Sequence, residues 1–318
     1  MRTRSLATGL ASIGWIVTAA LAGACGGGGG GDGTDATDGI APDAAPDPNY
    51  DIGFAKPAAV LQANAAGASV GAPDLSCLGT PTAVMAAATD ITLATKVTDF
   101  EHKQASGNVK VTAFAGTAVG TPFDSAVTSA SDGTVSVRIP AGTKLFGFKM
   151  TKSDSLDTLL LNQFIPATPA AQSYENIQNV LLATANTIPA LVGAGDDRVP
   201  GTGVLAGAVR DCQAHELSNF IATVSSTRGT PTFLPGASTY YFANGLPIRH
   251  QRHEASGPDG LFAVLNIPPA TTAYVQAWGY ASAADLAAGQ LTLVAEFATP
   301  VIAETVVTGS YRPLRTGE

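Results

Sequence analysis

Residues 131–142 read SDGTVSVRIPAG and give the strongest local sign of a β-hairpin in the sequence. Asp132-Gly133 is a dipeptide typical of a tight hairpin turn, and Val135, Val137 and Ile139 follow it at a period of two. Such alternation places the three apolar side chains on one face of a strand. The stretch therefore predicts antiparallel strands with one buried face, and the proline and glycine at its end predict a second turn.

The residues on either side of this stretch form further short apolar runs separated by turn signals. The predicted strands are Ile91–Val97, Val109–Phe114, Val127–Ser129, Val135–Ile139, Lys144–Met150 and Leu159–Ile165. Several short strands at regular spacing are typical of a β-sandwich. We therefore predict a first β-sandwich over residues 89–170.

The same marks return later in the chain, which indicates an internal repeat. Val97-Thr98-Asp99 returns as Val209-Arg210-Asp211, and the turn at Asp132-Gly133 returns as Asp259-Gly260. The second copy has a longer interval between its two marks, so it carries an insertion between Ser225 and Pro258. A second β-sandwich is predicted over residues 200–318.

Between the copies, residues 171–199 predict a helical connector. Ser173 is the expected N-cap, and Pro189 and Gly193 are expected to stop the helix. One face of this helix would carry the apolar stripe formed by Ile177, Val180, Leu181 and Thr184.

These residues resemble the carboxypeptidase regulatory-like domain, a transthyretin-like β-sandwich. The resemblance is carried by the two sets of repeat marks, by Ile139-Pro140-Ala141-Gly142 after the first turn and by Ile267-Pro268-Pro269 after the second. It implies a sandwich of about seven strands that sits beside other modules. It implies no reaction, because such domains have no catalytic residues of their own.

The N-terminus has the layout of an export signal. Arg2 and Arg4 precede an apolar or small stretch from Leu6 to Ala24, which leads into Cys25. Here the sequence resembles the lipobox of bacterial lipoproteins, although Ala22 stands where that motif usually has leucine. The resemblance implies cleavage after residue 24 and acylation of Cys25. The alternative is a soluble secreted protein in which Cys25 is incidental.

Residues 25–50 are predicted to form a disordered tether. The segment from Gly26 to Asn49 has no basic or aromatic residue and mixes aspartate with glycine, alanine, threonine and proline, so it cannot bury a core. As a flexible coil it would reach about 25–30 Å. The predicted fold is thus mainly β, with a signal peptide (1–24), this tether, an extended segment (51–88), two sandwiches and the helical connector.

Composition excludes some partners. Only 13% of residues are charged and the formal net charge is −8, and it becomes more negative once Arg2 and Arg4 leave with the signal. We therefore expect no nucleic-acid binding, and membrane attachment must rest on acyl chains. No cofactor is expected.

Two motifs suggest chemistry, and neither is expected to provide it. Gly67–Gly71 matches the nucleophile-elbow pattern GxSxG, but no strand–turn–helix context surrounds Ser69. His250 and His253 are spaced like a metal clip, yet Arg249 and Arg252 oppose a cation there. We expect neither a catalytic nor a metal site.

The insertion and a later strand contain the aromatic residues that could bind a ligand. The candidates are Tyr240, Tyr241, Trp278 and Tyr280. Exposed rings of this kind would stack sugars, which gives carbohydrate binding as the alternative function, whereas buried rings would only pack the core. In a strand Tyr240 and Tyr241 face opposite sides, so at least one is expected in the core.

Cys77 and Cys212 are the two cysteines that remain once Cys25 is lipidated. An oxidising compartment predicts that they form a disulfide, the alternative being two free buried thiols. The sequence as a whole predicts a non-catalytic structural or partner-binding lipoprotein of the bacterial envelope, with possible envelope-protein or glycan partners. By resemblance we expect it at the outer membrane, on a face that the sequence does not specify.

Overall fold

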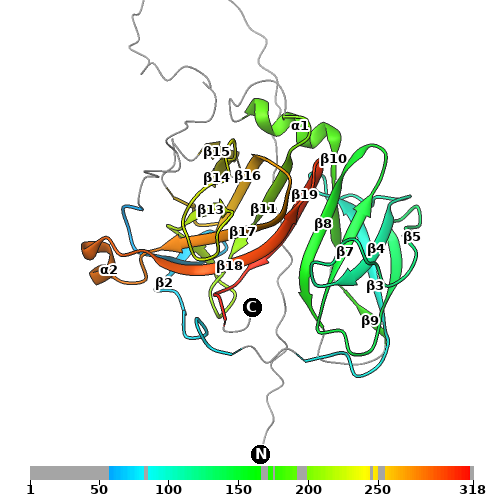
Figure 1. The fold of residues 1–318 in the computed structure, drawn as a ribbon, viewed down its shortest axis with the longest axis horizontal. Helices are drawn as coiled ribbons and strands as arrows, with labels where there is room; N and C mark the ends of the chain where they lie inside the picture. The colour runs from blue at the N-terminus through cyan, green and yellow to red at the C-terminus, as the bar shows by residue number, and fades with distance from the viewer. Residues whose placement is uncertain are drawn as a thin grey trace, which may run out of the picture.

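A computed structural model describes residues 57–81, 85–165, 171–174, 176–191, 199–243, 246–249 and 255–315 (Figure 1). Strands dominate these residues, and the described helices are α1 (Leu182–Leu191) and α2 (Ala283–Ala288). The prediction of a mainly β chain is confirmed. Cys25 and the predicted tether lie outside the described residues.

The first copy of the repeat, residues 91–181, packs two layers of strands. One layer contains β3 (Ile91–Asp99), β6 (Thr134–Ile139), β9 (Ala171–Ser173) and β10 (Ile177–Leu181). The other contains β4 (Lys110–Ala115), β5 (Val127–Thr128), β7 (Leu145–Thr151) and β8 (Ser155–Phe164). Their core contains Leu93, Val137, Val111, Phe148 and Ile177. The six strands predicted here are confirmed, with shifts at their ends.

The second copy, residues 203–311, repeats this arrangement. One layer contains β11 (Gly203–Val209), β14 (Ser238–Ala243), β15 (Leu246–Arg249), β16 (Leu261–Ile267) and β19 (Thr305–Tyr311). The facing layer contains β13 (Ile221–Ser225), β17 (Ala270–Gly279) and β18 (Thr292–Val301). Leu205, Val224, Phe262, Val275 and Val307 lie in their shared core. The hairpin of β14 and β15 is the predicted insertion.

The same glycine turn supports both copies. Gly133 has a φ of 83° and Gly260 a φ of 65°, a conformation that costs little only for glycine. Each glycine carbonyl accepts a hydrogen bond, Gly133 from Val97 (2.8 Å) and Gly260 from Val209 (3.0 Å). A β-carbon would collide with the carbonyl of the same valine at each position. The sequence repeat is therefore a repeat of the fold.

The two copies are joined edge to edge by one sheet. β19 pairs in parallel with β11 and with β8, where Thr305 lies opposite Asp157 and Thr308 opposite Leu160 (Figure 1). The side chains of β8 alternate, so that Leu160 packs against the first core and Leu159 lies in the second. The copies thus share a continuous sheet.

The predicted helix beginning at Ser173 is wrong. Ile177–Leu181 is strand β10, which pairs in parallel with β3 and antiparallel with β8. Its apolar residues fill the gap between two strands, so Ile177 joins the first core while Val180 packs on another cluster with Leu156. The helix begins at Leu182, and Pro189 lies inside it rather than at its stop.

Candidate functional site

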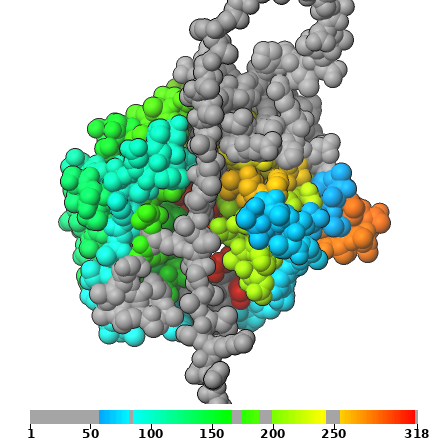
Figure 2. Space-filling model, turned by 180° about the vertical axis from the view of Figure 1, so that it is seen from behind, coloured from blue at the N-terminus to red at the C-terminus, as the bar shows by residue number. Residues whose placement is uncertain are grey.

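The N-terminal segment folds as a hairpin on the second copy. β1 (Gln62–Ala65) and β2 (Ala68–Gly71) pair with each other, and β1 pairs antiparallel with β12 (Glu216–Ser218). Seen from behind, this hairpin (blue) lies against the second copy (yellow-green and orange), away from the cyan strands of the first (Figure 2). Residues expected to be merely extended therefore form part of a small sheet.

One apolar and one polar side chain anchor this hairpin. Leu61 is 1% exposed, lies in the second core and donates its backbone N–H to the carbonyl of Tyr280 (2.9 Å). Asn64, also buried, donates through Nδ2 to Ser218 Oγ (3.0 Å) and to the carbonyl of Glu216 (3.3 Å). A buried side-chain amide costs stability unless its hydrogen bonds are made. The bonds of Asn64 to β12 therefore fix the register of β1 against that strand.

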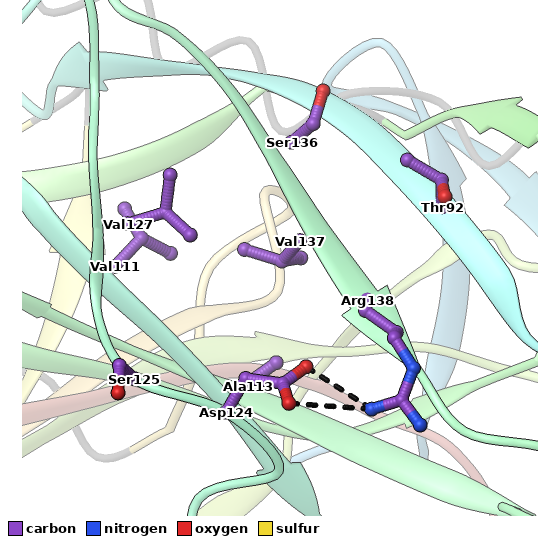
Figure 3. Close-up of a pocket in the computed structure, with 9 residues that line it drawn as sticks. All are labelled: Thr92, Val111, Ala113, Asp124, Ser125, Val127, Ser136, Val137 and Arg138. Carbon is purple, nitrogen blue, oxygen red and sulfur yellow. Dashed lines mark hydrogen bonds and ion pairs between the residues drawn. The ribbon is translucent and has the colours of Figure 1, made fainter.

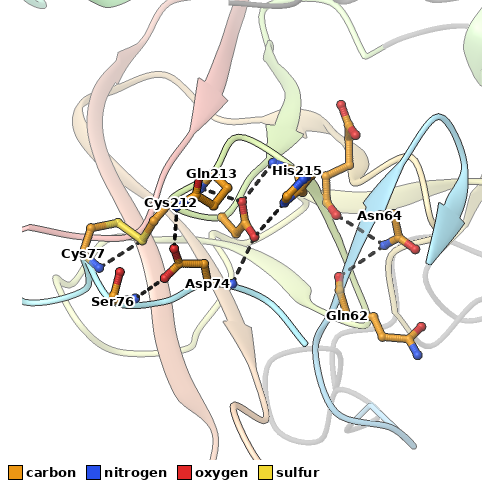
Figure 4. A network of polar contacts seen from close by, with 10 residues as sticks. Gln62, Asn64, Asp74, Ser76, Cys77, Cys212, Gln213 and His215 are labelled. Carbon is orange, nitrogen blue, oxygen red and sulfur yellow. Dashed lines mark hydrogen bonds and ion pairs between the residues drawn. A yellow bond between two sulfur atoms is a disulfide. The ribbon is translucent and has the colours of Figure 1, made fainter. Parts of the chain in front are cut away.

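A disulfide joins the next residues to the second copy. Cys77 and Cys212 are bonded, with their Cα atoms 5.9 Å apart and 135 residues between them in sequence. The predicted pairing is confirmed. The bond closes a loop that contains the whole first copy, so it ties the N-terminal segment directly to the start of the second (Figure 4).

The carboxylate of Asp211 organises the residues around this disulfide. It is 1% exposed and accepts backbone N–H groups from Asp74 (3.0 Å), Gln213 (2.9 Å) and His215 (2.9 Å), with His215 Nδ1 at 3.3 Å (Figure 4). In return, the Cys212 N–H donates to the carbonyl of Asp74 (2.9 Å). The carboxylate thus gives an acceptor to three backbone N–H groups of the surrounding loops, which fixes the positions of these loops relative to each other.

Asp74 extends the same network toward solvent. Its exposed carboxylate accepts the Ser76 N–H (2.9 Å) and Gln213 Nε2 (2.8 Å). Hydrogen bonds from the side chains of Ser76 and Gln213 lower the pKa of Asp74 to about 2. We call the set of Leu61, Asn64, Asp74, Cys77, Asp211 and Cys212 the N-terminal junction. It is a structural clamp and contains no arrangement of a nucleophile beside a base.

The motif Gly67–Gly71 is not a nucleophile elbow. Ala66 (φ 50°) and Gly67 (φ 79°) form the turn between β1 and β2, and Ser69 lies exposed on β2 with no helix after it. An elbow needs a strand, a sharp turn and a helix to present its serine. Chance similarity explains the match.

The described residues contain no cluster of three histidine, cysteine or acidic side chains that could hold a metal ion. His102 and His215 each contact a single aspartate, Asp99 (3.2 Å) and Asp211 (3.3 Å). His250 and His253 lie outside the described part of the chain, so their predicted lack of a metal is untested. Within that same part, no helix is long and apolar enough to span a membrane.

The aromatic residues suggested for sugar binding are buried. Tyr240, Tyr241, Trp278 and Tyr280 are 1%, 0%, 8% and 2% exposed, respectively. The Tyr241 hydroxyl accepts the Ala222 N–H (2.7 Å), and Trp278 Nε1 donates to Gln276 Oε1 (3.2 Å). Rings enclosed in this way cannot stack on a sugar, so the carbohydrate-binding interpretation of these residues is wrong.

Sequence reasoning found the two cysteines of the junction but missed its other members. Leu61 and Asn64 gave no signal because β1 is short and shows no long apolar period. Asp211 did give a sequence signal, because it occupies the position in the second copy that Asp99 occupies in the first. In both copies the aspartate caps the loop that follows, because Asp99 accepts the N–H groups of His102 (2.6 Å) and Gln104 (2.9 Å).

Comparisons with known proteins leave the family open. No family profile and no curated protein matches this sequence. Among solved structures, the Bacillus anthracis TIE protein aligns with 71% of this chain at 10% identity and a TM-score of 0.24, over 34% of its own length. The shaft pilin SpaA from Lactobacillus rhamnosus GG aligns with 72% at 12% identity and a TM-score of 0.20, over 98% of its length.

BcpA, the major pilin subunit of Bacillus cereus, gives similar values, with 69% of each chain aligned, 9% identity and a TM-score of 0.21. Superpositions this weak do not define a shared fold. The function must therefore be argued from the geometry of this chain.

Proposed function

We propose that this chain is a lipid-tethered, non-catalytic module of the bacterial cell envelope that acts as a structural or partner-binding element. Cys25 carries the acyl chains in this proposal, and the segment that follows it spans the distance to the folded part. The domains are the two copies of the repeat, and the face of the membrane is left open. A glycan role for the buried aromatic residues is not part of the proposal.

The N-terminal junction is the observation that carries this proposal. A membrane tether is useful only if its distal end is fixed to the fold, and here the end is fixed three times within residues 61–77. Leu61 is packed in the core, Asn64 is hydrogen-bonded to β12 and Cys77 is covalently bonded to Cys212. A pull on the tether would therefore act on the second copy through a covalent bond.

Mass spectrometry of the N-terminal peptide tests the lipid anchor. We expect a mature chain that starts at Cys25 and carries fatty acyl chains on it. An unmodified thiol, or cleavage at another bond, would contradict the proposal. In detergent phase partitioning, Cys25→Ser should move the protein to the aqueous phase, while the matched variant Cys77→Ser should stay in the detergent phase because it breaks only the disulfide.

We propose that the chain has no catalytic activity because of the geometry around Ser69, the candidate nucleophile. Ser69 lies on an exposed strand, and the described histidines each contact an aspartate that caps a loop. General acid–base or nucleophilic chemistry requires a base within reach of the nucleophile. A hydrolase screen over peptide, ester and glycoside substrates should show no turnover, and activity lost on Ser69→Ala would overturn this part.

A further inference from the structure

Strand β6 is the last strand of its sheet among the described residues, and one of its edges is free. β6 pairs on one side with β3, and no described strand pairs on the other. In an antiparallel ladder, residues alternate between those bonded to the partner and those whose N–H and C=O point away. Counting from the bonded pair of Val97 and Gly133, Ser136 and Arg138 point their backbone groups outward.

The second copy shows what occupies the equivalent edge. There β16 takes the place of β6, and β14 pairs with its outer side, Tyr240 opposite Ala263 and Tyr241 opposite Phe262. Aligned on the two glycine turns, Ala263 corresponds to Ser136 in the first copy. In the described part of the chain, one copy of this edge has an added strand and the other has none.

The added strand also fills the space between the two layers. The Tyr241 side chain is fully buried and reaches across to β13, where its hydroxyl accepts the Ala222 N–H (2.7 Å). A strand at this edge therefore contributes backbone hydrogen bonds on one side and a large aromatic side chain to the core. The second copy has both contributions at this edge.

In the first copy the same place is hollow. A cavity of about 230 Å³ opens between the layers, with Val111, Val127 and Val137 on its apolar wall (Figure 3). A second hollow of about 570 Å³ continues along β6 past Ser136 and Thr134. Val127 is 39% exposed although it is a large apolar residue. The free edge and the cavity together form a groove, which we call the β6 groove.

Charged groups define one end of the β6 groove. Arg138 donates through Nε to Asp90 (2.7 Å) and contacts Asp124 (3.2 Å) at the mouth of the cavity (Figure 3). Two carboxylates face one guanidinium, so this end carries a net negative charge. A strand antiparallel to β6 would begin at this end, and a basic residue near its N-terminus would complement the two aspartates.

We propose that the β6 groove binds an extended segment of a partner protein as an added strand, antiparallel to β6 as β14 is to β16. An aromatic side chain of the partner, opposite Val135 as Tyr241 is opposite Phe262, would enter the hollow lined by Val127 and Val135, and a basic residue would precede it. A second copy of this chain is the less suited occupant, because the net charge of −8 makes two copies repel. The inference deepens the proposed partner-binding role by naming the surface and the kind of partner.

The test uses a peptide that copies the strand already accepted in the second copy. The probe is a fluorescent peptide with the sequence of Gly236–Ala243 preceded by two lysines, and the protein is the full chain with Cys25→Ser. Fluorescence anisotropy should show saturable binding. Hydrogen exchange should show new protection at the amides of Ser136 and Arg138.

Variants of the protein and of the peptide locate the binding site. Ser136→Pro removes the outward N–H and should weaken binding about tenfold or more, whereas the matched Ser136→Ala keeps that N–H and should bind normally. An edge strand tolerates proline at a residue whose N–H faces outward, and an unchanged melting temperature checks the fold. A peptide with serine in place of the tyrosine that corresponds to Tyr241 should lose affinity for the unaltered protein as well.

Equal binding to Ser136→Pro, or protection confined to other strands, would overturn the proposal. Self-association of the chain that depends on Ser136 would also overturn it, since it would assign the groove to a second copy. The assay needs no lipid. A failure of acylation at Cys25 would therefore leave this result unchanged, and a failure here would leave the tether intact.

Discussion

The two copies of the repeat have the same arrangement of strands, and they differ in the further segments that pack against it. In both, an aspartate caps the loop after the first strand, with backbone bonds from Asp99 to Gln104 and from Asp211 to His215 at 2.9 Å each. Only Asp211 also holds the N-terminal segment. Among the described residues, the second copy alone has a strand on its outer edge, where β14 pairs with β16. The second copy is thus closed by the chain itself, whereas no described strand closes the first.

The largest expected effect of a single change is at the closing strand. Tyr241→Ala should lower the free energy of unfolding by about 3–5 kcal/mol, because it empties a fully buried position. Val127→Ala, in the β6 groove of the first copy, should lower the free energy of unfolding by about 0.5 kcal/mol or less. Urea denaturation followed by circular dichroism measures both. Similar losses for the two variants would contradict the view that only one edge is closed.

The disulfide should have the next largest effect. Replacing both Cys77 and Cys212 with serine should cost about 2–4 kcal/mol, since the unfolded chain regains the freedom of a long loop. Limited proteolysis should then cut residues 57–80 first, because the contacts that remain, Leu61 in the core and the short ladder of β1 with β12, are noncovalent. Chemical reduction of the unaltered chain serves as the control. A variant as stable as the parent would show that the noncovalent contacts suffice.

The capping aspartates offer a matched pair. Asp211→Ala should cost about 1–3 kcal/mol because it leaves buried N–H groups without an acceptor. Asp99→Ala should cost less, since Asp99 does not hold the N-terminal segment. The difference between the two should vanish in a background that lacks both cysteines and the hairpin contacts of Asn64. If the two substitutions lower the free energy of unfolding equally in the unaltered chain, Asp211 does not help to hold the N-terminal segment.

The smallest effect concerns the aspartates of the two glycine turns, whose pKa values move in opposite directions. Burial raises the pKa of Asp259 to about 6, while hydrogen bonds from the side chain and backbone of Thr134 lower the pKa of Asp132. Between pH 4 and 6, folded Asp259 keeps a proton that the unfolded chain releases, so stability falls as the pH rises. Asp132 acts in the opposite sense, since its contribution is lost as the pH falls through its lowered pKa.

Asp259→Asn should therefore flatten the loss of stability between pH 4 and 6 and stabilise the chain above pH 6. Asp132→Asn should destabilise it at pH 7 and have less effect in strong acid. Melting temperatures over a pH series measure both slopes. Parallel slopes in the two variants would mean that the turns have the same environment.

Local signals accounted for much of the first copy. The glycine turn and the period-two residues Val135, Val137 and Ile139 act within one hairpin, so adjacent residues determine them. Residues 177–181 were misassigned because Ile177, Val180 and Leu181 also satisfy a helical period. What selects the strand is the gap between β3 and β8, and both of those strands lie outside the segment whose period was read.

The junction and the aromatic residues were harder to predict for the same reason. Asn64 and Asp74 find partners more than 130 residues away, and no local pattern specifies them. Tyr240 and Tyr241 face opposite sides of β14, so the sequence placed at least one of them in the core and did not decide whether the other would be exposed. Both are buried because Tyr240 meets a small cluster with Leu265 while Tyr241 enters the main core.

The pairing of β19 with β8 has a consequence for the order of folding. β19 is the last strand of the described chain, and Thr305 meets Asp157 only after a very long loop has closed. Loop closure over such distances is slow compared with hairpin formation. The hairpins of each copy can form early, but Leu159 and Leu161 on β8 stay uncovered until the final strand arrives. Until β19 docks, the edge of β8 at Asp157–Leu160 lacks its partner strand, so we expect this edge to gain hydrogen-exchange protection late in folding.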